Sequence, residues 1–133
     1  MNLSNFNWEE YLSLAIELES QSKDPNQTIK HARLRSSISR AYYSAFCICR
    51  NYLKHKEGKK LPKDQSIHKI VIEDFLNSND ITKREIGDFL KKLRQQRNKA
   101  DYDDTFSNPE KTTSYSILLA SDIIEKIKLL YHL

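Results

Sequence analysis

The chain has 133 residues, of which 38% are hydrophobic and 30% charged, with a formal net charge of +4 at pH 7. This composition excludes a disordered chain and favours one globular domain over residues 1–133. No apolar run approaches the roughly 20 residues of a membrane span, and the start, MNLSNFNWEE, lacks the features of a signal peptide. We therefore expect a cytoplasmic protein outside the membrane. Two glycines and three prolines allow few tight turns, which favours helices over strands.

The first helix is expected to begin within NWEEYLSLAIELES. Asn7 can cap it, and Glu10 follows three residues later, as in a capping box. Apolar side chains then recur at helical spacing, at Trp8, Tyr11, Leu14, Ala15 and Leu18. The helix is expected to end in SKDPNQ, because the residue before Pro25 is pushed away from helical conformation.

The segment TIKHARLRSSISRAYYSAFCICRNYL, residues 28–53, predicts a second and longer helix. Its apolar stripe contains Ile38, Ala41, Tyr42, Ala45, Cys49 and Leu53, widened by Leu34, Phe46 and Ile48. Between residues 41 and 49 almost the whole circumference is apolar, which is typical of a helix buried by several neighbours. Cys47 and Cys49 point to different sides of this helix, so we expect buried thiols and no disulfide between them.

Three further helices follow along the chain. The third is predicted in SIHKIVIEDFL, with a buried face made by Ile67, Ile70, Val71 and Phe75. The fourth is expected to use Thr82 as its cap with Glu85 three residues later, and the fifth to use Asn108 with Pro109 as its first residue. The fifth presents an apolar face of Tyr115, Leu118, Leu119, Ile123, Ile127 and Leu130. The predicted fold class is all-α, a helical bundle of about five helices.

Six lysines lie between residues 54 and 69, in a segment with only two carboxylates before Lys69, Glu57 and Asp64. One interpretation is a solvated loop. The other is a grip on nucleic-acid phosphates by Lys54, Lys56, Lys59 and Lys60. No aromatic residue is interleaved here, so a base-stacking platform is not predicted.

The fourth helix carries an arginine on its apolar face. The stripe runs through Ile86, Phe89, Leu90 and Leu93, and its next turn falls on Arg97 and then Ala100. A buried guanidinium is costly unless it is paired or meets an anion. It can pair with Asp101, four residues on, and so lock the helix end or hold two subunits in register. Alternatively, Arg97 faces a phosphate in a cleft or dimer seam, supported by Arg94 and Asn98.

The four histidines show no spacing typical of a metal site, and no metal or other cofactor is expected. His68 is expected to be a half-exposed surface residue, although it could approach Arg97 from the third helix. A two-fold dimer is expected, because the apolar second helix and a buried Arg97 suggest more buried surface than one small bundle covers.

Two stretches together resemble the HEPN family of small helical-bundle proteins. They are SRAYYSAF, residues 39–46, and RNKADY, residues 97–102. The resemblance, to short stand-alone members with R-x-x-A-D-Y, covers nearly the whole chain. It implies a prokaryotic toxin–antitoxin or defence context, frequent dimerisation and, in many members, metal-independent cleavage of RNA.

The family signature is R-x(4–6)-H, and this chain departs from it. Arg97 and Asn98 match its start, but the histidine is absent, and four intervening residues lead instead to Tyr102. An aspartate titrates near about 3.9 and a tyrosine near about 10, so neither Asp101 nor Tyr102 suits proton transfer at neutral pH as histidine does. The tentative catalytic set is Arg97, Asp101 and Tyr102.

Three hypotheses follow from this resemblance. The first is a HEPN-like module that binds RNA, nucleotide phosphate or a protein partner, with weak or absent RNase activity. The second is an active endoribonuclease toxin, and the third a structural dimerisation subunit of a larger defence complex. The partners implied are a second copy of the chain, RNA, and a nucleotidyltransferase-type antitoxin or a defence-complex protein. We favour the first hypothesis, because the arginine that holds phosphate is present and the histidine that moves protons is absent.

Overall fold

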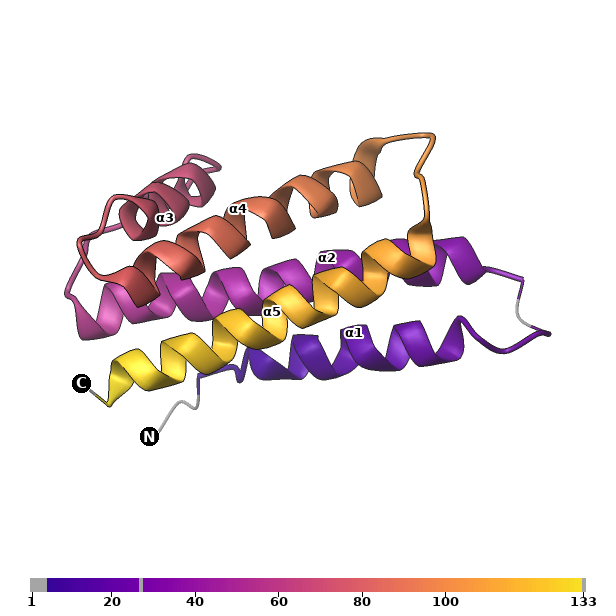
Figure 1. Cartoon of the computed structure of the whole chain (residues 1–133), viewed down its shortest axis with the longest axis horizontal. Helices are drawn as coiled ribbons and strands as arrows, with labels where there is room; N and C mark the ends of the chain where they lie inside the picture. The colour runs from indigo at the N-terminus through magenta and orange to yellow at the C-terminus, as the bar shows by residue number, and fades with distance from the viewer. Residues whose placement is uncertain (1–4, 27, 133) are drawn as a thin grey trace.

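The computed structural model describes residues 5–26 and 28–132, and these residues form helices and no strand. Five α-helices follow one another along the chain: α1 Glu9–Gln21, α2 Lys30–Asn51, α3 Ile67–Leu76, α4 Ile81–Tyr102 and α5 Pro109–Tyr131. A π-helical turn, η1 Tyr52–Lys56, continues α2 directly. The predicted all-α bundle of about five helices is therefore confirmed (Figure 1).

No helix in the described part of the chain combines the length and apolar character needed to cross a membrane.

The second helix is central, as predicted. It packs against α1, α4 and α5, which run beside it along the long axis of the molecule, and α3 packs mainly on α4 (Figure 1). The stripe expected for this helix is fully buried, with 0% exposure at Ile38, Ala41, Tyr42, Ala45, Cys49 and Leu53. Cys47 and Cys49 are free and buried. The apolar circumference of α2 is thus covered within a single chain.

The buried face of α5 differs from the predicted one. Leu119, Ile123, Ile127 and Leu130 are buried as expected, but Tyr115 is 44% exposed and Leu118 64% exposed. Thr113, Ser116 and Ala120 take their places against the core, each with 0% exposure. The Thr113 hydroxyl donates to the Pro109 carbonyl at 2.7 Å, so this small polar residue is satisfied when buried. Small residues here allow α5 to lie close to α2.

Other local predictions also need correction. Asp80, not Thr82, caps α4, because its carboxylate accepts the backbone N–H of Lys83 at 2.9 Å. Asn108 does precede Pro109 at the start of α5, but it has a left-handed φ of 48° and makes no side-chain cap bond. Near α1, the Asn7 carboxamide accepts the N–H of Glu9, although Trp8 occupies the cap position.

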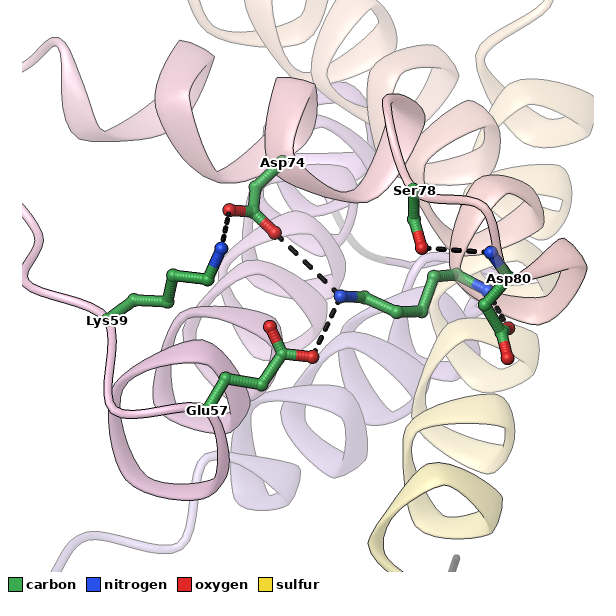
Figure 2. Close-up of polar contacts among 6 residues, drawn as sticks. Glu57, Lys59, Asp74, Ser78 and Asp80 are labelled. Carbon is green, nitrogen blue, oxygen red and sulfur yellow. Dashed lines mark hydrogen bonds and ion pairs between the residues drawn. The ribbon is translucent and has the colours of Figure 1, made fainter.

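The lysine-rich segment is tied to the bundle more firmly than a solvated loop would be. Gly58, with a left-handed φ of 68°, turns the chain after η1. The Lys83 ammonium on α4 lies 2.8 Å from Glu57 and 3.9 Å from Asp74 on α3. Asp74 also accepts from Lys59 at 2.9 Å. Figure 2 shows the carboxylates of Glu57 and Asp74 on either side of the same ammonium group, that of Lys83. The network links the end of η1 to both α3 and α4.

Candidate functional site

Arg97 lies on the buried face of α4, as its spacing predicts. Leu93 precedes it and Ala100 follows it on that face, exposed by 0% and 2% respectively. Only 12% of the Arg97 side chain is exposed. The core position of this guanidinium makes it the centre of the candidate site.

Three polar partners surround the Arg97 guanidinium. One terminal nitrogen, Nη2, donates to the Tyr43 hydroxyl at 2.5 Å, and Nη1 donates to the Asn98 carboxamide at 3.1 Å. The Nε atom lies 2.9 Å from a carboxylate oxygen of Asp101. The predicted Arg97–Asp101 ion pair is therefore present, although the Nε–H does not point along the line to that oxygen.

The same guanidinium lies among the rings of Tyr42, Tyr43 and Tyr102, an arrangement that we call the Arg97 cage. Its carbon is 5.6 Å from the centroid of Tyr42, 5.0 Å from that of Tyr43 and 5.8 Å from that of Tyr102. Cation–π attraction to these rings helps offset the cost of burying the charge. Tyr42 is fully buried, whereas Tyr102 is 73% exposed and borders the solvent. The two motif segments, residues 39–46 and 97–102, thus meet at one point in the fold.

Behind this cage lies a buried pair that the sequence interpretation missed. The Tyr42 hydroxyl and Nδ1 of His68 are 2.6 Å apart, and the His68 ring stacks on Phe46 with centroids 4.3 Å apart. His68 is only 6% exposed, so its assignment as a half-exposed surface residue is wrong. It shares a buried face of α3 with Val71, Ile72 and Phe75, while the predicted Ile70 is 41% exposed.

Helical spacing was the sequence signal that could have revealed the burial of His68, because His68 precedes Val71 by three residues and Ile72 by four. Burial, together with the charges of Arg94 and Arg97, lowers the pKa of His68 from 6.5 to about 4. Burial also raises the pKa of Tyr42 far above its usual value. The pair is consequently neutral at pH 7, and neither group is poised to exchange a proton there.

Arg94 lies one turn before Arg97 and faces a different space. Its Nε atom is buried and has no hydrogen-bond partner among the described residues. The side chain lines a cavity of about 300 Å³ between α3 and α4, together with Lys69, Ile72, Glu73, Leu76, Lys91, Gln95 and Asn98. Asn98 therefore stands between the two arginines, contacting Arg97 and lining the Arg94 cavity.

The candidate lysines do not all face one site. Lys54, Lys59 and Lys60 line a groove of about 1110 Å³, which we call the α1–α2 groove, whereas Lys56 does not line it. Lys59 is already paired with Asp74. The sequence interpretation missed three further cations in this groove, Arg40, Arg50 and Lys63. Tyr43 and His68 also line it, so the groove reaches the Arg97 cage.

This arrangement of side chains is suited to binding an anion rather than a metal ion. Among the described residues, no three His, Cys, Asp or Glu side chains are grouped so that they could hold a metal ion. The Asp101 carboxylate is engaged with Arg97 and with the Ser39 hydroxyl, which lies 3.4 Å away. Arg97 and Arg94 are the two cations of the site: Arg97 lies among the tyrosines, and Arg94 lines the cavity between α3 and α4.

Comparison with known proteins identifies the family of the chain. No curated protein and no solved structure gives a match to the chain. The model of the HEPN domain matches residues 19–130, which is well over half of the sequence and includes both motif segments and the Arg97 cage. The chain therefore belongs to the HEPN domain family.

Proposed function

We propose that this protein is a HEPN module of a prokaryotic toxin–antitoxin or defence system that binds RNA through its phosphates and cleaves RNA weakly or not at all. One observation carries the proposal: Arg97, the residue that would hold a phosphate, is surrounded by Tyr43, Asn98 and Asp101, and none of them is an imidazole.

Cleavage by attack of a 2′-hydroxyl needs a group that moves protons near neutral pH as well as a cation that stabilises the phosphorane. The nearest described histidine in this cluster, His68, is bound to Tyr42 and kept neutral by its surroundings. Asp101 is engaged by Arg97, and Tyr102 projects toward solvent. The cluster supplies the cation without an evident proton carrier.

We expect a phosphate to approach Arg97 from the side of Asn98, which is exposed. Nη1 of Arg97 donates to Asn98, whose carboxamide is a neutral acceptor on the exposed face of α4. A phosphate oxygen in place of that carboxamide would add the attraction between two opposite charges to the hydrogen bond, which offsets the loss of the Asn98 contact. Binding would therefore displace Asn98 and leave the Tyr43 and Asp101 contacts in place.

The first test measures RNA binding and RNA cleavage by the purified protein and two variants. Arg97→Lys keeps a charge at the site but loses the planar fork of N–H donors that can bind a phosphate through two bonds, so we expect RNA affinity to fall at least several-fold. Arg84→Lys, the same change at an exposed arginine on the same helix, is the matched control and should bind as the unmodified protein does. Thermal melting of each variant separates loss of binding from loss of folding.

The same assay tests the missing histidine. Tyr102→His places an imidazole where the family signature has one, and cleavage should rise by about 10²–10⁴-fold if proton transfer is the missing step. Strong cleavage by the unmodified protein that is lost on Tyr102→Phe would overturn the proposal in favour of an active endoribonuclease toxin. No binding of RNA by the folded protein would overturn the binding function itself.

A protein partner is proposed on the resemblance and on the accessibility of Tyr102. Its ring is 73% exposed while its face covers Arg97, so a nucleotidyltransferase-type antitoxin could modify its hydroxyl without unfolding the bundle. Co-expression with such an enzyme should add the mass of a nucleotide to the protein. Tyr102→Phe should abolish the added mass, whereas Tyr115→Phe, another exposed tyrosine, should leave it unchanged.

A further inference from the structure

We propose that the α1–α2 groove is a binding site for single-stranded RNA, separate from the Arg97 cage and meeting it at Tyr43. This inference rests on the proposed RNA-binding function and names the surface that carries it. The groove combines an excess of positive charge, partly exposed aromatic rings and a volume suited to an extended ligand.

The groove carries an excess of positive charge. Six cationic side chains line it, Arg40, Arg50, Lys54, Lys59, Lys60 and Lys63. Only one carboxylate, Asp64, lines it with them. The excess of five charges is larger than the formal charge of +4 on the whole chain, so the remainder of the chain has a net negative charge. This excess of positive charge attracts an anionic ligand to the groove.

Most of these cations are available to a ligand. Lys59 is paired with Asp74, and Asp64 accepts from the backbone N–H and hydroxyl of Ser66. The other five cations have no ion-pair partner among the described residues: Arg40, Arg50, Lys54, Lys60 and Lys63. Five unpaired cations along one groove suit a ligand with several phosphates rather than one.

Aromatic rings stand beside the cations. The guanidinium of Arg50 lies 5.3 Å from the Trp8 ring, and that of Arg40 lies 5.0 Å from the Tyr11 ring. Trp8 and Tyr11 contact each other edge to face, with centroids 5.4 Å apart. Tyr43 is a third partly exposed ring in the groove. Phosphate-binding cations interleaved with rings on which bases stack are the recognition chemistry of single-stranded nucleic acids.

The lysine segment alone could not reveal this arrangement. It contains no aromatic residue, and the rings come from Trp8 and Tyr11 at the start of the chain and from Tyr43 on α2. Packing of α1 against α2 brings them to the lysines.

The groove is large enough to hold an unpaired strand. Its volume of about 1110 Å³ lies above the range of roughly 300–1,000 Å³ that is usual for small-molecule sites. The rings of Trp8, Tyr11 and Tyr43 form part of the groove wall. The bases of a duplex are paired and already stacked on one another, so they cannot stack on these rings. Tyr43 and His68 also line the groove, and the Tyr43 hydroxyl accepts from Arg97. A strand bound here would thus approach the Arg97 cage.

Trp8 provides a direct test, because it is the single tryptophan of the chain and lines the groove. Unlabelled oligouridine of about ten nucleotides, within the roughly 4–16 nucleotides typical of such sites, is titrated while Trp8 emission is recorded. Stacking should quench the emission saturably. Inorganic polyphosphate and an RNA duplex of matched charge should give little quenching, because neither presents an unpaired base.

The variants separate the contribution of charge to binding from the contribution of base stacking. Lys54→Ala with Lys60→Ala should weaken binding about tenfold or more and reduce the salt slope by about 1.4, as loss of two phosphate contacts to a single strand requires. Lys23→Ala with Lys111→Ala removes the same charge from exposed positions outside the groove. This control should change the affinity and its salt dependence less. Tyr11→Leu should weaken binding of oligouridine but not of polyphosphate.

The outcomes separate this inference from the proposed function. RNA binding that leaves Trp8 emission unchanged, survives the Lys54/Lys60 double variant and is lost in Arg97→Lys would overturn the groove site while supporting the proposed function. Equal quenching and equal affinity for duplex and single strand would overturn the single-stranded specificity. Absence of any RNA binding would overturn both, and an acidic peptide that binds the groove when RNA does not would identify a protein ligand.

Discussion

At the scale of single residues, the least expected feature is the contact between Tyr42 and His68. Both side chains are polar and both are buried, and each satisfies the other across 2.6 Å. A buried hydroxyl or imidazole without a partner costs about 1–3 kcal/mol. The pair therefore fixes α3 against α2 at the same place where Tyr42 also supports Arg97.

This pair predicts how stability depends on pH. The pKa of His68 is about 4 in the folded protein, against about 6.5 in an unfolded chain. Between these values the unfolded state binds the extra proton, so stability rises with pH through this window and falls as pH drops from 6.5 to 4. We expect a loss on the order of 2 kcal/mol across it.

Urea unfolding at several pH values measures this dependence. His68→Gln, which keeps an acceptor for Tyr42 but does not titrate, should lose the part of the slope that His68 contributes. His55→Gln changes an exposed histidine on η1 and should retain the slope. A slope unchanged in His68→Gln would show that His68 is not the group responsible.

At the scale of elements, the contact between α3 and α4 sets the geometry of the site. Gly87 on α4 is buried, and a Cβ atom built there would lie 2.7 Å from the backbone nitrogen of Leu76 at the end of α3. Absence of a side chain thus lets the two helices approach closely. In this packing His68 of α3 lies against Tyr42, and Arg94 of α4 lines the cavity between α3 and α4.

Gly87→Ala should consequently destabilise the protein even though alanine favours helix by about 1 kcal/mol relative to glycine. The added methyl group meets backbone, which moves only if α3 shifts, and overpacking of this kind costs about 1–3 kcal/mol. We expect a net loss of about 1 kcal/mol or more in the free energy of unfolding. Lys99→Ala, at an exposed position on the same helix, is the control. A raised melting temperature in Gly87→Ala would show that α3 yields freely.

At the scale of the whole molecule, one premise of the dimer prediction has changed. The circumference of α2 is covered by its own chain, and Arg97 finds its partners there too. A two-fold dimer stays a prediction, and its support is now the apolar surface that remains exposed. Tyr102 is 73% exposed beside the Arg97 cage, and Tyr115 and Leu118 are 44% and 64% exposed on α5.

Light scattering at high micromolar concentration should therefore give twice the mass of one chain. The seam is expected to include α4 near Arg97, so Tyr102→Asp should shift the protein toward monomer by placing a charge in the interface. Leu118→Asp tests the exposed face of α5 in the same way. Dissociation by Leu118→Asp alone would place the dimer interface on α5. A strictly monomeric unmodified protein would contradict the dimer prediction.

Helical periodicity in the sequence was sufficient for the fold class, the central role of α2 and the burial of Arg97. These features depend on which positions share one face of a helix, and the residue types along the chain determine that directly. The same reasoning predicted the Arg97–Asp101 pair, because residues four apart on a helix are neighbours.

Tertiary structure alone decided which faces meet. It buried His68 against Tyr42, exposed Tyr115 and Leu118, capped α4 with Asp80, and joined Trp8 and Tyr11 to the lysine-rich segment as one groove. Each of these outcomes depends on packing between segments or on a local backbone geometry that several sequences satisfy. The spacing of residues within one helix determines its faces, but the shapes and polar groups of other helices determine what each face contacts.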